Sequence, residues 1–323
     1  MTNIFGTTVD TLVNGPAFSA RIASLPNMFT RIQANWFEIN PSAGVFNFAS
    51  APSCNDAMIA TALAQGRTIL FDVWGWPAWV QADWANRYQH MQDYVTAVLK
   101  HWPGVAILGC WNEPSFDQQP DNVLVKGVTG NTITVTIAQL MTEYHNLVMA
   151  IYNAKQAVNP KVQLNIGKFG NFQSYTPHMQ LLKSLGTWAM GDYITWHDAN
   201  DQFMNPAVDN PQTGTYSATP SVAHQCQWAA ALFPGKMYGS DESYDYVTAY
   251  SVASTLAYRD NGASMLIKQY IPYPVPAAVI GQPIAAIYGT DANGNINLRS
   301  QAVIGLLTEP STSFMMPIWK AAE

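Results

Sequence analysis

Charged side chains are scarce in this chain of 323 residues, where Lys, Arg, Asp and Glu together make up 11%. Soluble domains usually carry about a quarter. The net charge of −6 comes without a basic cluster, which argues against nucleic acid and membranes as partners. No apolar run reaches the length of a membrane span, and the amino terminus lacks the pattern of a secretion signal. We therefore expect a soluble protein that is cytoplasmic, exported by another route, or supplied without its leader.

Cysteine is nearly absent, with only Cys54, Cys110 and Cys226 in the whole chain. No CxxC pattern occurs, and the six histidines are scattered without an HExxH motif. We therefore predict neither a metal nor any other cofactor. Cys110 lies in an apolar run and is predicted to be an inert core thiol. Whether Cys54 and Cys226 pair is left open, because spacing alone cannot show a disulfide.

Hydrophobic residues are plentiful, at 48%, and short apolar runs alternate with longer helix-compatible stretches. This alternation is typical of a parallel α/β sheet. Eight candidate strands favour a closed (β/α)8 TIM barrel that forms a single domain over residues 1–323. The predicted strands are Ile4–Thr8, Met28–Asn35, Thr68–Trp74, Val105–Asn112, Val162–Gly167, Tyr193–His197, Lys236–Ser240 and Ser264–Tyr270.

The predicted helices are Asp56–Gln65, Tyr88–His101, Ile137–Val158, Pro177–Leu185, Ser221–Leu232 and Val247–Asp260. Two insertions interrupt the alternation. Val123–Thr136 alternates β-branched residues around a Thr-Gly-Asn turn and predicts a hairpin after the fourth strand. Phe203–Pro220 is rich in Pro, Asn, Gly and Thr and predicts a long loop after the sixth strand.

The stretch Gly109–Pro114 is the most informative in the chain. An apolar run leads into Asn112, Glu113 and Pro114, and the residue before a proline is disfavoured in a helix. Glu113 is therefore predicted to be the last extended residue of the fourth strand. Barrel enzymes keep catalytic groups at the carboxyl ends of their strands. An ordinary strand-end carboxylate, satisfied by local N–H groups, is the alternative.

A second acidic residue ends the predicted seventh strand, in the run Lys236–Ser243. Glycoside hydrolysis needs two carboxyl groups, one on each side of the bond that breaks. Glu242 is the candidate partner of Glu113, and Asp241 is its rival, because neighbouring strand residues point to opposite faces.

In this order the motifs resemble those of the large Asn-Glu-Pro clan of retaining (β/α)8-barrel glycoside hydrolases. The nearest family is that of the β-xylosidases, α-iduronidases and exopolysaccharide hydrolases. The resemblance rests on Arg31 with Trp36, Asn40–Phe48, Asp72–Trp79, Trp111–Pro114, Tyr193–His197 and Asp291–Asn295. Three positions depart from the family pattern: Asn40 replaces a Glu, Ser240–Ser243 differs from the usual Thr-Glu, and Tyr270 ends a strand where Trp is common.

The resemblance implies a retaining hydrolase, an O-glycosyl hydrolase of the glycosidase type, that degrades a polysaccharide or oligosaccharide, including microbial exopolysaccharide. Glu113 would be the general acid/base and Glu242 the nucleophile, with carboxyl groups roughly 5–5.5 Å apart. Asn112 would bind the sugar 2-hydroxyl. Arg31 would hold Glu242 ionised, unless it forms an ion pair elsewhere. The other candidate contacts to the sugar are Trp36, Trp74, Trp76, Trp79, Trp111, His197 and Tyr270.

Aromatic rings suit sugar faces but also fill cores, so at least one tryptophan after the third strand is expected in the core. His197 is expected to bond a sugar hydroxyl or Glu242, or else to be structural. The expected partner is a carbohydrate, and the chain is a monomer or a simple homo-oligomer. A non-catalytic carbohydrate-binding barrel is the competing hypothesis. A barrel with unrelated chemistry is the third, and only Lys168 and Lys268 end strands where a Schiff-base lysine would serve it.

Overall fold

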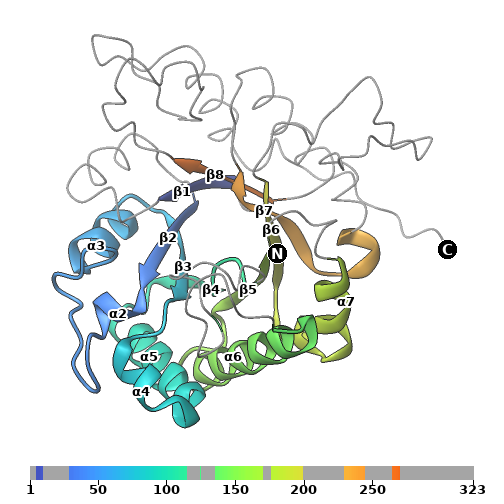
Figure 1. The fold of residues 1–323 in the computed structure, drawn as a ribbon. Helices are drawn as coiled ribbons and strands as arrows, with labels where there is room; N and C mark the ends of the chain where they lie inside the picture. Colours follow the sequence, from blue (N-terminus) through green and yellow to red (C-terminus); the bar gives the residue numbers. More distant parts are fainter. Residues whose placement is uncertain are drawn as a thin grey trace, which may run out of the picture.

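The structure is a computed structural model that describes residues 5–9, 29–114, 124, 135–169, 176–198, 229–243 and 264–269. Eight parallel strands follow one another around a closed barrel, and β1 pairs with both β2 and β8. Figure 1 shows the strands as a ring. The strands are β1 (Phe5–Val9), β2 (Phe29–Asn35), β3 (Thr68–Trp74), β4 (Val105–Cys110), β5 (Gln163–Phe169), β6 (Tyr193–Asp198), β7 (Met237–Ser243) and β8 (Ser264–Gln269).

The central strands are apolar because both of their faces are covered. In β3 and in β5 every residue after the first is buried, and β4 is buried at all positions but one. A parallel sheet with side chains filling its interior and helices outside has this pattern. Asp72 breaks the apolar run of β3, and a charge at a fully buried position must find a partner.

Helices cover the outside of the barrel along β2 to β6 (Figure 1). They are α2 (Trp36–Ile39), α3 (Asp56–Ala64), α4 (Ala78–Ala82), α5 (Arg87–His101), α6 (Ile137–Val158), α7 (Thr176–Ser184) and α8 (Thr187–Met190), with a 3-10 turn η2 at Trp84–Asn86. The helix α6 begins at a capping box, in which Thr136 and Gln139 satisfy each other's backbone N–H groups.

The eight-strand alternation predicted from the sequence is confirmed, and each strand lies within about three residues of its expected bounds. Four helices were also expected close to where they occur, and residues 229–232 of the predicted fifth are helical. The hairpin at Val123–Thr136, the loop at Phe203–Pro220 and the helix at Val247–Asp260 lie outside the described residues, wholly or almost so. The short helices α2, α4 and α8 were not expected.

A bulge shapes the carboxyl end of β5. Gly167 and Phe169 face consecutive residues of β6, so Lys168 is an extra residue in the strand. Gly167 has φ 98° and Lys168 has φ 56°, values that an ordinary strand never shows. Bulges of this kind re-aim side chains beside functional sites. The bulge therefore marks this end of the barrel as a candidate functional site.

Candidate active site

The Trp111–Pro114 turn follows β4 directly. The strand ends at Cys110, and φ is 67° at Trp111 and 46° at Glu113. The prediction that Glu113 is the last extended residue is therefore wrong. A following proline disfavours the right-handed helical region, and Glu113 avoids that region with a left-handed backbone instead of an extended one. Left-handed backbone at bulky residues costs of order 1–3 kcal/mol each and concentrates at functional sites.

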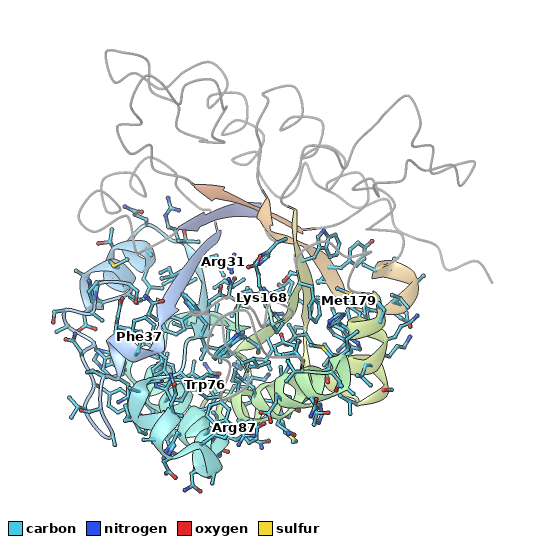
Figure 2. All side chains as sticks on the ribbon, in the orientation of Figure 1. Arg31, Phe37, Trp76, Arg87, Lys168 and Met179 are labelled. Carbon is cyan, nitrogen blue, oxygen red and sulfur yellow. The ribbon has the colours of Figure 1, made fainter. Side chains whose placement is uncertain are left out.

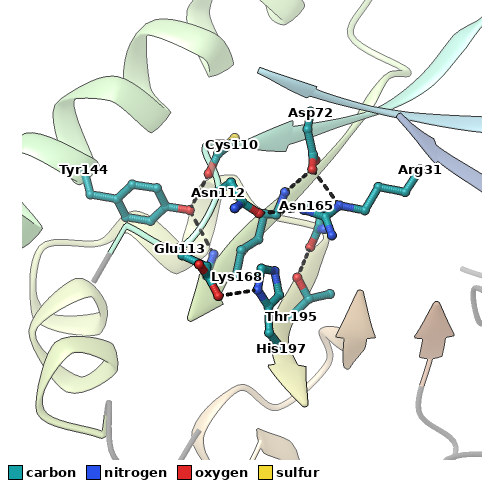
Figure 3. A network of polar contacts seen from close by, with 11 residues as sticks. Arg31, Asp72, Cys110, Asn112, Glu113, Tyr144, Asn165, Lys168, Thr195 and His197 are labelled. Atoms are coloured by element: carbon teal, nitrogen blue, oxygen red, sulfur yellow. Dashed lines mark hydrogen bonds and ion pairs between the residues drawn. The ribbon is translucent and has the colours of Figure 1, made fainter. Parts of the chain in front are cut away.

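The carboxylate of Glu113 contacts the imidazole of His197, at the end of β6. The distance from Glu113 Oε1 to His197 Nδ1 is 3.0 Å, and Figure 3 shows the two side chains facing each other. His197 is 1% exposed, whereas the Glu113 side chain is 21% exposed. A buried ring thus holds a carboxyl group that keeps access to its surroundings. The sequence had suggested a sugar hydroxyl or Glu242 as the partner of His197, and it did not identify Glu113.

A buried ion cluster lies inside the barrel, next to this turn. Arg31 Nε donates to Asp72 Oδ2 at 2.6 Å, and Lys168 Nζ contacts the same oxygen. All three side chains have 0% exposure. Figure 2 shows Arg31 and Lys168 within the ring of strands. Buried charges are stable only when they are paired. Here one carboxylate from β3 serves cations from β2 and β5.

Arg31 also connects the cluster to the turn. Its Nη2 donates to Asn112 Oδ1 at 2.8 Å. With the amide oxygen of Asn112 accepting from a guanidinium, its NH2 group is left to donate to a ligand. The sequence left two places open for Arg31, an ion pair elsewhere in the fold or a place at the barrel axis. The structure puts Arg31 inside the barrel, paired with Asp72.

A hydroxyl group from the outer layer joins the strained ends of β4 and β5. Tyr144 on α6 donates from its hydroxyl to the carbonyl of Cys110 at 2.9 Å and accepts from the N–H of Gly167 at 3.0 Å. Both bonds are buried. One hydroxyl thus satisfies two backbone groups next to the residues with positive φ, and it fixes the two strand ends relative to each other.

Two glycines make room for these contacts. A Cβ at Gly109 would lie 1.7 Å from Asp72 Oδ1, and one at Gly167 would lie 2.7 Å from the carbonyl oxygen of Thr195. The carboxylate of Asp72 thus occupies the space that any other residue at Gly109 would fill. Its position is set by the neighbouring strand as well as by its two cations.

Trp36 and Trp79 belong to the aromatic packing beside β2. Trp36 is fully buried, its indole N–H donates to Asn40 Oδ1 at 3.1 Å, and its ring stacks on Tyr94 at 4.8 Å. Trp79 donates to the backbone oxygen of Asn40 at 2.9 Å. Both indoles are therefore bound to the turn at Asn40. Of the three tryptophans at and after the end of the third strand, Trp74 and Trp76 belong to the buried core and Trp79 packs against it, so the expectation that at least one of them is core is confirmed.

Trp74, Trp76 and Trp111 differ from that pair. They are 9%, 7% and 0% exposed, and none of their indole N–H groups has a hydrogen-bond partner among the residues that the structure describes. The rings of Trp76 and Trp111 lie 5.1 Å apart. A buried donor without an acceptor costs about 1–3 kcal/mol. Trp74 ends β3 and Trp76 follows it, and both residues keep a little exposed surface although their indole N–H groups are buried.

The second acidic pair lies on β7, for which the backbone is described. Ser240 pairs with Trp196, and Glu242 pairs with His197, so Asp241 is an extra residue at a bulge. Glu242 is therefore the acidic residue in register with the histidine that contacts Glu113. Tyr270, the remaining predicted contact, lies outside the described residues.

Sequence reasoning missed two members of this network, Asp72 and Tyr144. Asp72 could have been found, because a carboxylate within the apolar run Thr68–Trp74 requires buried cations. Lys168 was considered only as a Schiff-base nucleophile; in the structure its side chain is fully buried and paired with Asp72. Nothing in the pattern of α6 distinguishes Tyr144 from an ordinary core tyrosine.

The remaining sequence expectations concern thiols, metals and membranes. Cys54 and Cys110 are buried free thiols, and burial raises the pKa of the Cys110 thiol far above its usual range. Cys110 is thus an inert core residue, while Cys226 lies outside the described residues. Within the described ranges no group of His, Cys, Asp and Glu could hold a metal ion. No helix among those residues is both long and apolar enough to cross a membrane.

No known family model matches the sequence, and no curated protein aligns with it. Solved structures do share the fold. A glucosidase from Croceicoccus marinus is 13% identical, with a TM-score of 0.61 over 95% of this chain and 67% of that one. A family 39 glycoside hydrolase from Bacteroides cellulosilyticus WH2 is also 13% identical, with a TM-score of 0.62 over 93% of this chain and 63% of that one.

A rice β-glucosidase is 11% identical, with a TM-score of 0.60 over 95% of this chain and 98% of that one. The chain spans only 63% of the length of the Bacteroides enzyme. At identities this low the likeness establishes the fold, which is the (β/α)8 barrel that these three glycosidases share.

Proposed function

We propose that this chain is a retaining glycoside hydrolase that cleaves an oligosaccharide or polysaccharide by double displacement. One observation carries the proposal. Glu113, after β4, lies 3.0 Å from His197 on β6, and the backbone of His197 is in register with Glu242 on β7. One acidic residue therefore follows β4 and the other lies in the last residues of β7, at the carboxyl ends of strands, where barrel enzymes bind substrates. The barrel shared with three glycosidases supports the same reading.

Glu113 is proposed as the general acid/base. Its carboxyl group is partly exposed, so it can reach a leaving-group oxygen, and the buried His197 fixes its direction. In the first step Glu113 gives its proton to the departing sugar oxygen. In the second step it takes a proton from the water that releases the product.

Glu242 is proposed as the nucleophile in preference to Asp241. The register favours it, because the bulge in β7 skips Asp241 and pairs Glu242 with His197. A retaining reaction needs the two carboxyl groups roughly 5–5.5 Å apart. Adjacent parallel strands lie about 4.8 Å apart, so a residue beside His197 is close enough to act with Glu113.

The substrate side of the proposal rests on Asn112, Trp74 and Trp76. The amide of Asn112 is oriented by Arg31 with its NH2 available, and in a glycosidase this group would donate to a sugar hydroxyl. The indole N–H groups of Trp74 and Trp76 are buried without an acceptor among the described residues, and the small exposed parts of these two residues are proposed to contact a sugar. The low charge of the chain favours a neutral or weakly anionic glycan, including a microbial exopolysaccharide. The family nearest in motif remains that of the β-xylosidases, α-iduronidases and exopolysaccharide hydrolases.

Chemical rescue tests this proposal. Glu113→Ala and Glu242→Ala are assayed with activated aryl glycosides and a polysaccharide panel, with and without azide. We expect azide to restore Glu242→Ala through a glycosyl azide of inverted configuration, and Glu113→Ala through one of retained configuration. Glu143→Ala, on the outer helix α6, is the matched control and keeps full activity.

A Glu242→Ala variant that is as active as the wild type would contradict the proposed nucleophile. A wild-type protein that binds glycans without cleaving any would instead support a non-catalytic carbohydrate-binding barrel.

A further inference from the structure

An exposed aromatic side chain, Phe37, lies at the end of the barrel that carries Glu113. Among the described residues five large hydrophobic side chains are exposed, and Phe37, which is 42% exposed, is the only aromatic one. It belongs to α2, which begins directly after the last residue of β2. Single exposed aliphatic residues are ordinary in folded proteins. An exposed ring at the carboxyl ends of the strands differs from them, because barrel enzymes bind their substrates there.

The ring of Phe37 lies against the backbone that leaves the neighbouring strand. Gly75 follows β3 directly, is buried and has φ 79°. A Cβ at this glycine would lie 3.1 Å from Phe37 Cδ1, closer than an ordinary van der Waals contact. The ring therefore occupies the space that a side chain at Gly75 would need, between Trp74 and Trp76 in the chain. The ends of β2 and β3 together set its position.

The backbone on both sides of Phe37 is held in place. Trp36, before it, is fully buried. Glu38, after it, accepts from Asn35 Nδ2 at 2.8 Å and from the backbone N–H of Ser53 at 2.7 Å. The exposed ring is thus carried by a fixed turn of helix. A ligand that binds to a preorganised side chain loses less affinity to conformational ordering.

Phe37 is connected to the Trp111–Pro114 turn through another aromatic residue. Trp76 is adjacent in the chain to the glycine that Phe37 covers, and its ring lies 5.1 Å from the ring of Trp111. Figure 2 shows Phe37 beside α2, outside the ring of strands that encloses Arg31. Phe37 therefore lies at the rim of the candidate site. At this rim it can contact a part of the substrate that lies away from the bond that is cleaved.

We propose that Phe37 is the platform of a distal sugar-binding subsite, on which one unit of a glycan chain stacks while the bond at Glu113 is cleaved. This inference rests on the proposed function and deepens it, because it names chains, not short glycosides, as the preferred substrates. An aromatic ring offers an apolar face that suits the C–H groups of a sugar. Binding energy from a remote unit of the substrate can then be used at the reacting bond.

Kinetics as a function of chain length test the inference. The wild type is screened on the polysaccharide panel, and fragments of the polysaccharide that it degrades, from disaccharide to hexasaccharide, become the substrates beside the matching aryl glycoside. Phe37→Ala removes the ring, Phe37→Leu keeps an apolar side chain over Gly75, and Phe37→Trp keeps a flat ring. Met149→Ala is the matched control, because Met149 is 39% exposed on the outer helix α6.

We expect wild-type kcat/KM to rise with chain length until a sugar reaches Phe37. Phe37→Ala loses this last rise, so its kcat/KM for the longest fragment falls roughly 10-fold, as expected when a partly exposed apolar side chain no longer covers a ligand. Its kcat/KM for the aryl glycoside stays unchanged, since that substrate does not reach the rim. Phe37→Leu follows Phe37→Ala, whereas Phe37→Trp and Met149→Ala keep the wild-type profile.

Equal losses on the aryl glycoside and on the longest fragment in Phe37→Ala would overturn the inference, because they indicate general damage to the site. A wild-type profile in Phe37→Leu, or a loss in Phe37→Trp as large as in Phe37→Leu, would overturn it as well. If Phe37→Ala does not fold, Phe37→Leu and Phe37→Trp still decide.

Failure of the proposed function appears separately, as a wild type that degrades no polysaccharide and no aryl glycoside, and the inference then falls with it. A wild type that degrades a polysaccharide, with the same length profile in every Phe37 variant, would leave the function standing and remove the role of Phe37.

Discussion

Two arginine–carboxylate clusters in this protein have opposite surroundings. The inner one joins Arg31, Asp72 and Lys168 without any exposed surface. The outer one joins Arg87 on α5 with Glu143 on α6, with side chains 14% and 22% exposed, and Figure 2 shows Arg87 on the outer helices. The outer pair is partly exposed to solvent, whereas the inner cluster is fully buried.

The partners of the two clusters show what each is for. The Arg87 guanidinium lies over the ring of Tyr88, 4.1 Å from its centroid, and the Tyr88 hydroxyl donates to Glu143. These contacts tie two helices together. The Arg31 guanidinium instead orients Asn112, beside Glu113. A partly exposed pair thus serves packing, and a fully buried cluster serves the position of polar groups at the candidate site.

The largest effect is expected when the carboxylate at the centre of the inner cluster is removed. Asp72→Ala leaves Arg31 and Lys168 buried without their shared partner, and we expect a loss of about 3–5 kcal/mol in the free energy of unfolding. Urea unfolding measures it. Glu143→Ala in the outer cluster is the matched change, and an equal loss there would erase the distinction.

A single methyl group should also disturb the inner cluster. In Gly109→Ala the new Cβ would overlap Asp72 Oδ1, so the carboxylate must move, and we expect a loss of about 3 kcal/mol. Gly44→Ala is the control: it has φ 72° and nothing within 4 Å of its Cβ position, and strain alone should cost it about 1–2 kcal/mol. A smaller loss for Gly109→Ala than for Gly44→Ala, by urea unfolding, would contradict the crowding at Asp72.

Two buried tyrosines allow the effect of losing a single hydroxyl group to be compared. Tyr144→Phe removes the hydroxyl that serves Cys110 and Gly167, and we expect it to cost about 1–3 kcal/mol. Tyr94→Phe removes a buried hydroxyl that has no partner in the described part of the chain, so it should be neutral or slightly stabilising. Thermal unfolding of both variants checks this, and equal effects would show that the bridge between β4 and β5 contributes nothing.

The smallest effect is expected in the outer cluster. Burial, followed by the hydrogen bond to Glu143, raises the pKa of Tyr88 to about 12. Because this pKa lies above that of an unfolded tyrosine, its contribution to stability is complete below about pH 10 and is lost as pH rises toward 12. Glu143→Gln should lower the Tyr88 pKa, seen by ultraviolet titration, and cost under about 1 kcal/mol at neutral pH.

The barrel itself could be predicted from the sequence because strands buried on both faces consist of apolar runs such as Thr68–Trp74. Glu113 could be placed at the end of its strand for the same reason. Its backbone could not, since the proline rule excludes one region without choosing between the others. The register of β7, which favours Glu242 over Asp241, depends on a bulge that the local sequence pattern does not predict.

The contacts between the site residues were harder to predict than the strands that carry them. Arg31, Asp72 and Lys168 come from three strands separated by 41 and 96 residues, and only the closure of the barrel brings them together. Asp72 and Gly109 give the one recoverable hint: a buried charge on one strand faces the residue without a side chain on the next.

Trapping the covalent intermediate tests the central claim most directly. The protein is incubated with a panel of activated 2-deoxy-2-fluoro glycosides, digested, and its labelled peptide is sequenced by mass spectrometry. We predict one sugar adduct per chain, on Glu242, and no adduct in Glu242→Gln. An adduct on Asp241, or turnover with inverted product configuration and no adduct, would contradict the account.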